Sequence, residues 1–291
     1  MAESDRGQPH RRAEGVVRGS IRRFVEADGP SHSRAFAYHS MFVLLSGFIG
    51  VIGLATILDI EVFRSTVREL TVGLAPGPAG RVLQSAISHG SSQPTAAVLG
   101  LGAALVTGTL AMSQFQRSAN RLLGIDRDRR PLRRLAVAFL LAMSAGLLLA
   151  SAAMLLAGGR ALATGTGWDT TVAWTIVRWP LGVVVAGVAI LLLYRVAPRG
   201  RPGSRSAMLI GSAVAIVLWI LFTGLLAVYF AVGDRTAETY GPLVGVVALL
   251  LWSGLSSLAL HIGFAVTAQL AGRPGTSPRT ITIPEAAPTP R

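Results

Sequence analysis

The sequence predicts an all-α, polytopic membrane protein, a bundle of six transmembrane helices with short interfacial helices. Hydrophobic residues make up 51% of the 291 residues and charged residues only 14%, a balance that soluble domains of this size do not show. In residues 240–269, a histidine is the only acidic or basic group. Because a hydrocarbon core about 30 Å thick is crossed by roughly 20 apolar residues in a helix, this run is long enough to span a membrane.

Further apolar runs extend this pattern to six predicted spans. We expect them at about residues 36–58, 94–113, 135–156, 172–196, 207–232 and 242–270. They divide the chain into a basic N-terminal segment (1–34), a membrane domain (35–271) and a proline-containing disordered tail (272–291). The connection 59–94 shows helical apolar spacing twice between glycine and proline breaks, which predicts two short interfacial helices.

An amphipathic helix is predicted at residues 14–27, before the first span. The apolar residues expected on one face, beside arginines, are Val17, Ile21, Phe24 and Val25. Such a helix can lie on an anionic membrane surface with its apolar side down. Alternatively, it packs on the cytoplasmic loops as a short solvated helix. The sequence leaves both interpretations open.

Small residues recur at helical spacing in the first three spans. In the first span, Gly47, Gly50 and Gly53 share a face that lets another helix approach closely. The second and third spans each carry a stripe with a spacing of four: Ala96, Gly100, Ala104 and Gly108, then Ala138, Ala142, Gly146 and Ala150. Two such stripes on consecutive helices predict a tight helical hairpin, because lipid supplies no hydrophobic force between helices.

The distribution of charge predicts the orientation. All 27 basic residues are arginines. With a cytoplasmic N-terminus and six spans, 21 arginines and 8 acidic residues face the cytoplasm, whereas 6 arginines and 6 acidic residues face outward. The positive-inside rule therefore places both termini in the cytoplasm. Anionic lipid headgroups on that side account for the basic balance, so no nucleic-acid partner is predicted.

The sequence lacks the common catalytic motifs, and its predicted spans lack the carboxylates typical of ion coupling. The spans contain no Asp or Glu, the usual proton or sodium carriers in secondary transporters. Cysteine is absent, as are the His-Glu-x-x-His, phosphate-loop and Gly-x-Ser-x-Gly motifs. We therefore predict no enzymatic activity, no metal and no cofactor.

Arg178, beside Trp179 and Pro180, is the strongest candidate for a functional side chain. Near the outer interface, its guanidinium either anchors the helix beside a belt tryptophan or lines a wet cavity, where it would bind phosphate or carboxylate. His261 lies deeper, and both a hydrogen bond between helices and a proton site remain open. His39, near the inner interface, is interpreted as a packing residue.

Several stretches together carry a family resemblance. They are residues 35–45 (AFAYHSMFVLL), 118–125 (SANRLLGI), 177–181 (VRWPL), 192–198 (LLYRVAP) and 239–252 (TYGPLVGVVALLLW), with Trp219. Over about residues 34–270 the chain resembles the YihY/BrkB family of bacterial inner-membrane proteins, and it departs from the family pattern at Ser46 and Ala265. The resemblance implies six helices in the inner membrane. The former family label, ribonuclease BN, does not fit, because the residues that would hold a nuclease's metals are missing.

Relatives in this family also carry a virulence label and a proposed role in envelope lipid transport. Our first hypothesis is therefore a transporter or flippase for an anionic lipid or envelope metabolite, and the alternative is a non-transporting scaffold or assembly factor that binds partner helices. Membrane lipids are the predicted partners, and homo-oligomers are compatible with both. The candidate substrate-binding residues are Arg178, His261, an outer gate at Tyr240, and inner headgroup contacts at Ser118, Asn120, Arg121, Tyr194 and Arg195.

Overall fold

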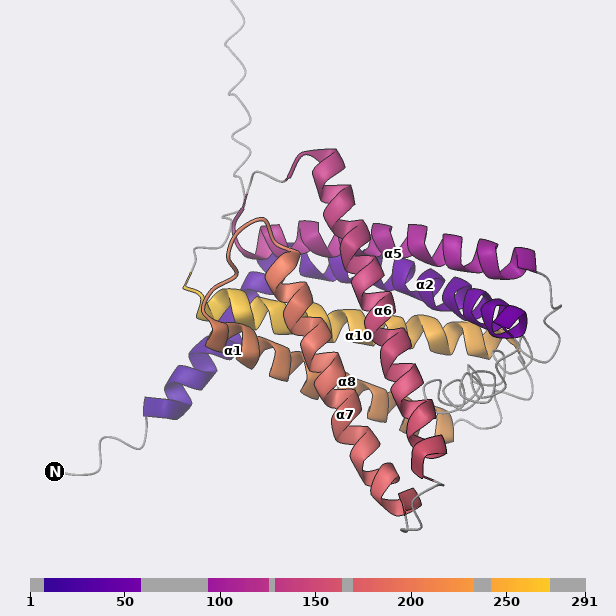
Figure 1. Ribbon diagram of the computed structural model, residues 1–291. Coiled ribbons are helices and arrows are strands. Elements are labelled where there is room, and N and C mark those ends of the chain that lie inside the picture. Colours follow the sequence, from indigo (N-terminus) through magenta and orange to yellow (C-terminus); the bar gives the residue numbers. More distant parts are fainter. Residues whose placement is uncertain (1–7, 59–93, 126–128, 164–169, 233–241, 273–291) are drawn as a thin grey trace, which may run out of the picture.

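The computed structural model describes residues 8–58, 94–125, 129–163, 170–232 and 242–272, and the regular structure in these ranges is α-helical (Figure 1). This confirms the predicted all-α class. The helices are α1 (Gln8–Glu26), α2 (Gly29–Leu58), α5 (Pro94–Leu122), α6 (Pro131–Ala163), α7 (Thr170–Val196), α8 (Arg205–Val232) and α10 (Pro242–Leu270).

Five of these helices are long and apolar enough to cross a membrane. Their apolar segments are Gly29–Val51, Ala97–Leu122, Pro131–Leu148, Arg205–Phe230 and Gly245–Leu270, and α7 contains a shorter one, Pro180–Val196. The polytopic architecture is thus confirmed, and the six predicted spans roughly match. The interfacial helices predicted at 59–94 fall outside the described residues, apart from the start of α5.

The helices extend beyond the predicted spans at several ends. α5 continues to Leu122 and α6 to Ala163, where the sequence had suggested ends near 113 and 156. The polar residues that follow position 113 favour a helix as well as a loop, so they do not end the helix, and the apolar segment of α5 continues to Leu122. Gly124, at φ 67°, follows the end of α5, in the left-handed conformation that often terminates a helix.

α2, α5 and α10 lie side by side, and α8 packs on α10 (Figure 1). The contact between α2 and α5 is the most extensive. A Cβ atom at Gly50 would come within 2.5 Å of the Leu101 backbone nitrogen, and one at Gly53 within 2.7 Å of the Ala97 nitrogen. The prediction that the first-span glycines admit a close neighbour is therefore confirmed, and that neighbour is α5.

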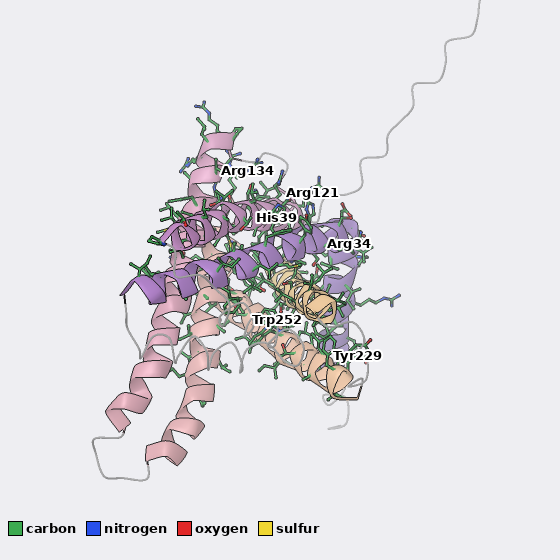
Figure 2. All side chains as sticks on the ribbon, turned by 90° about the vertical axis from the view of Figure 1, so that its right-hand side faces the viewer. Arg34, His39, Arg121, Arg134, Tyr229 and Trp252 are labelled. Carbon is green, nitrogen blue, oxygen red and sulfur yellow. The ribbon has the colours of Figure 1, made fainter. Side chains whose placement is uncertain are left out.

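The predicted tight hairpin between α5 and α6 is wrong over much of its length. A Cβ atom at Gly108 would lie 3.4 Å from the Ala142 Cβ, but at Gly146 no atom of the described residues lies within 4 Å, and Leu147 is 70% exposed. The small face of α5 at Gly100 packs against α2, so it is not available to α6. In both views α6 and α7 project together beyond the other helices (Figures 1 and 2).

The side-chain core lies toward one end of the bundle. Phe36, Phe115, Tyr194 and Phe264 are buried there, with Phe115 and Phe264 ring centroids 5.8 Å apart. At this end α2, α6 and α8 begin, and α1, α5, α7 and α10 end. We call it the arginine-rich end, for the residues described next.

Candidate functional site at the arginine-rich end

Exposed guanidinium groups gather at the arginine-rich end. Figure 2 shows one of them, Arg121, and the partly exposed Arg134 apart from Tyr229 and Trp252. The acidic residues with described side chains, Glu14, Glu26 and Asp28, are also exposed but far fewer. The surface is therefore strongly positive, which favours binding of anions. Its exposed arginines are Arg18, Arg22, Arg34, Arg121, Arg130, Arg133, Arg195, Arg199, Arg201 and Arg205.

Arg129, which is partly buried, instead binds the end of α7. Its Nη1 donates to the carbonyl oxygen of Ala197 at 2.7 Å and to Oε1 of Gln116 at 3.2 Å. Its Nη2 donates to the carbonyl oxygens of Pro198 (2.7 Å) and Val196 (3.2 Å). A helix C-terminus carries partial negative charge and unpaired carbonyls. The connection between α5 and α6 thus fastens α7, a role that the arginine run in the sequence did not reveal.

Arg23 joins α1 to two spanning helices. Its Nη1 donates to the carbonyl oxygen of Leu122 at 3.0 Å, and its Nε donates to Oε1 of Gln269 at 3.2 Å. Burial lowers the pKa of Arg23, while the nearby Glu26 carboxylate raises it. α1 therefore packs on the ends of α5 and α10, and this contact does not decide between the two predicted interpretations, a membrane-surface helix and a solvated helix on the cytoplasmic loops.

The residues predicted as inner headgroup contacts divide into two groups. Arg121 and Arg195 are exposed, with Arg121 4.0 Å from Asp28. Asn120 is buried and accepts the backbone N–H of Arg199 through Oδ1 at 2.8 Å, and Ser118 is also buried. The structure therefore brings only the two arginines to the surface, and their role in binding stays a prediction.

Tyr194 and His261 are both fully buried and meet around Phe115. The Tyr194 hydroxyl donates to the Leu260 carbonyl oxygen at 2.6 Å, which ties α7 to α10. The His261 Nδ1 lies 2.8 Å from the carbonyl oxygen of Ser257, one turn earlier in its own helix. Its Nε2 meets no hydrogen-bond partner among the described residues.

The hydrogen bond from α10 to α2 is made by Ser257, not by His261. The Ser257 hydroxyl donates to the Ser33 carbonyl oxygen at 2.7 Å. His39 likewise contacts its own helix, with Nδ1 2.7 Å from the Ala35 carbonyl oxygen. Ser257 lies in the middle of α10 and gave no sequence signal for this bond, because serines also occur in most of the other predicted spans.

Two predicted site residues cannot be placed. The side chain of Arg178 falls outside the described part of α7, and Tyr240 lies in 233–241, also outside it. Their roles stay predictions. Within the described residues, no group of three or more His, Asp or Glu side chains could hold a metal ion.

A sequence model of one family, described as Virulence factor BrkB, matches residues 20–282. The chain belongs to the BrkB family. The match covers the described helices except the first part of α1, and it confirms the resemblance noted in the sequence. No curated protein and no solved structure matches this BrkB protein.

Proposed function

We propose that this BrkB protein moves an anionic lipid or an anionic envelope metabolite across the inner membrane, with its arginine-rich end in the cytoplasm. The observation that most supports this proposal is the set of exposed arginines at the ends of membrane-spanning helices. A guanidinium binds phosphate or carboxylate through two parallel hydrogen bonds. Anionic headgroups are therefore the ligands that fit this surface best, and no enzymatic step is proposed.

The charge distribution supports the orientation and the inner contacts. Positive residues favour the cytoplasmic side of spanning helices, so the arginine-rich end and both termini belong there. Arg121 and Arg195 are exposed on two different helices at this end. They are the proposed first contacts for a headgroup that leaves the inner leaflet, and Arg178 and Tyr240 are the proposed contacts nearer the outer side.

The arrangement of α6 and α7 supports lateral entry of a lipid. Leu140, Leu147 and Val184 are 64%, 70% and 59% exposed on these two helices. In a bilayer such apolar surfaces face acyl chains. A lipid bound by its headgroup at the arginine-rich end can therefore keep its tails in the bilayer beside this pair.

The test is a scrambling assay in liposomes that contain the full chain and a fluorescent phosphatidylglycerol or, in parallel, a fluorescent phosphatidylcholine. We expect faster movement of the anionic lipid and a several-fold loss for Arg121→Gln combined with Arg195→Gln. The matched Lys variants keep the charge and should lose less. Arg178→Ala tests the outer contact. Rates equal to protein-free liposomes for both lipids would reject transport of this class.

The scaffold alternative also has an observation in its favour. On four helices of the bundle, a Cβ atom added at Gly102, Gly182, Gly224 or Gly254 would meet no atom of the described residues within 4 Å. Open glycines allow a partner helix or a second copy to approach. Crosslinking in native membranes separates the hypotheses, because stable stoichiometric partners without lipid movement favour the scaffold.

A further inference from the structure

α1 presents two apolar faces, of which only one packs against the bundle. Ser20, Phe24 and Ala27 are buried. Val17 and Ile21 are 58% and 56% exposed, and Val25, one turn further on, is 61% exposed. The sequence had placed Phe24 on the same face as these three, so that expectation is corrected. The exposed stripe consists of Val17, Ile21 and Val25, each four residues from the next.

α1 lies beside the ends of two membrane-spanning segments. Arg23 donates to the carbonyl oxygen of Leu122, the last residue of the apolar segment Ala97–Leu122. It also donates to Gln269, one residue before the end of Gly245–Leu270. α1 is therefore held beside the ends of two apolar segments that are long enough to span a membrane.

Positively charged side chains lie next to the exposed stripe, on the side that faces away from the bundle. At 3.6 residues per turn, Arg18 and Arg22 lie on one side of the stripe around the helix axis, and the buried Phe24 lies on the other side. Both arginines are exposed, and Arg22 lies 3.8 Å from Glu26. Glu14 borders the stripe at its N-terminal side. Guanidinium groups beside an apolar stripe are what a helix in the membrane interface presents to anionic lipid.

We propose that α1 lies on the bilayer surface, with Val17, Ile21 and Val25 at the boundary between headgroups and acyl chains. Arg18 and Arg22 then bind the phosphates of anionic lipids. A bilayer surface fits better than a protein partner, because α1 is fixed beside the ends of two spanning segments and carries charge complementary to anionic lipid. This placement holds whether or not the bundle moves a substrate.

The absence of cysteine from the sequence permits a clean labelling test of the full chain. Ile21→Cys carries a nitroxide in nanodiscs of phosphatidylcholine with and without phosphatidylglycerol. Collision rates are measured with oxygen, which partitions into lipid, and with a water-soluble nickel complex. Leu140→Cys on α6 is the lipid-facing control, and Glu26→Cys is the water-facing control. We expect the oxygen-to-nickel collision ratio at 21 to lie between those at 140 and 26 and to move toward the value at 140 in the anionic nanodiscs.

Two results would overturn the proposal. If the label at 21 is as accessible to the nickel complex as the label at 26, the stripe of Val17, Ile21 and Val25 faces water. A label shielded from both reagents means that protein, such as a second copy, covers the stripe. The combined variant Arg18→Gln and Arg22→Gln should weaken membrane contact in anionic nanodiscs by about fivefold per arginine. If the ratio of oxygen to nickel collision rates at position 21 is unchanged in this variant, the proposed binding of lipid phosphates by Arg18 and Arg22 is contradicted.

Failure of this test is distinguishable from failure of the proposed transport. A chain that moves no lipid in liposomes can still show a lipid-facing label at position 21. Conversely, a water-facing label there leaves the scrambling result unaffected.

Discussion

Two parts of this bundle are held together in different ways. Where α2 meets α5 and α8 meets α10, helix backbones come together at glycines such as Gly50 and Gly211, where an added Cβ would strike the neighbouring backbone. The α6–α7 pair is instead attached near the arginine-rich end, by Arg129 and Tyr194. In lipid, close backbone packing and polar bonds are the available sources of helix association. Small residues fix a helix along its length, whereas polar bonds at one end fix only that end.

The largest expected effect comes from forcing α2 and α5 apart. In Gly50→Val, the new side chain would overlap the backbone of Gly100 and Leu101, which cannot move aside as a flexible side chain would. We expect a loss of about 3 kcal/mol or more in the free energy of unfolding, at the upper end of overpacking costs. The measurement is tryptophan fluorescence during denaturation in mixed micelles. Gly102→Val is the control, since nothing lies within 4 Å of a Cβ there. Equal stability of the two variants would contradict the proposed role of backbone contact.

A smaller loss is expected when the attachment of α7 is removed. Arg129→Ala deletes four hydrogen bonds and leaves the carbonyls of Val196, Ala197 and Pro198 without this donor. We expect a loss of about 2 kcal/mol, because hydrogen bonds to a charged group exceed neutral ones. Hydrogen exchange should increase at the end of α7 and remain unchanged in α2. Arg130→Ala, at an exposed neighbour, should have little effect, and a uniform increase over all helices would contradict a local attachment.

The buried tyrosine provides the second attachment of α7. Tyr194→Phe removes the hydroxyl that donates to the Leu260 carbonyl oxygen and keeps the ring contacts with Phe115 and Phe264. We expect a loss of about 1 kcal/mol, within the range measured for hydrogen bonds between membrane helices. The same denaturation assay applies, with the exposed Tyr38→Phe as control. A loss no larger than that of the control would show that the rings alone hold α7 here.

The smallest effect, of opposite sign, is expected on α6. Gly146→Ala adds a methyl group where no atom of the described residues lies within 4 Å, so its expected effect is a higher helix propensity. We expect a gain of about 0.5 kcal/mol. A clear loss would indicate that α6 packs against another helix at this position, as the sequence had suggested.

The sequence predicted the membrane class, the approximate spans and the family, because apolar length is a local property of the chain. It also identified the small residues of α2 as a packing face. It could not assign the partner of each stripe, since the stripe of α5 suits α2 as well as α6. The competition between them is decided by three-dimensional fit, and the three glycines of α2 permit the closer approach.

In the candidate site, too, some features follow from the sequence and others only from the packing. That arginines gather at one end follows from counting charges along the chain. Which of them are exposed does not follow, because Arg23, Arg129 and Arg121 have the same side chain in similar sequence contexts. Only packing shows that Arg23 and Arg129 bind the ends of helices while Arg121 faces solvent.

What the sequence by itself determined is therefore that this chain enters a membrane through several apolar helices, because the free energy of transfer to lipid adds up along a segment. The tertiary structure alone decided that α6 and α7 diverge from α5, that Phe24 packs inward while Val17, Ile21 and Val25 remain outside, and that Tyr194 is buried. These outcomes depend on which surfaces meet, and residues far apart in the chain determine them together.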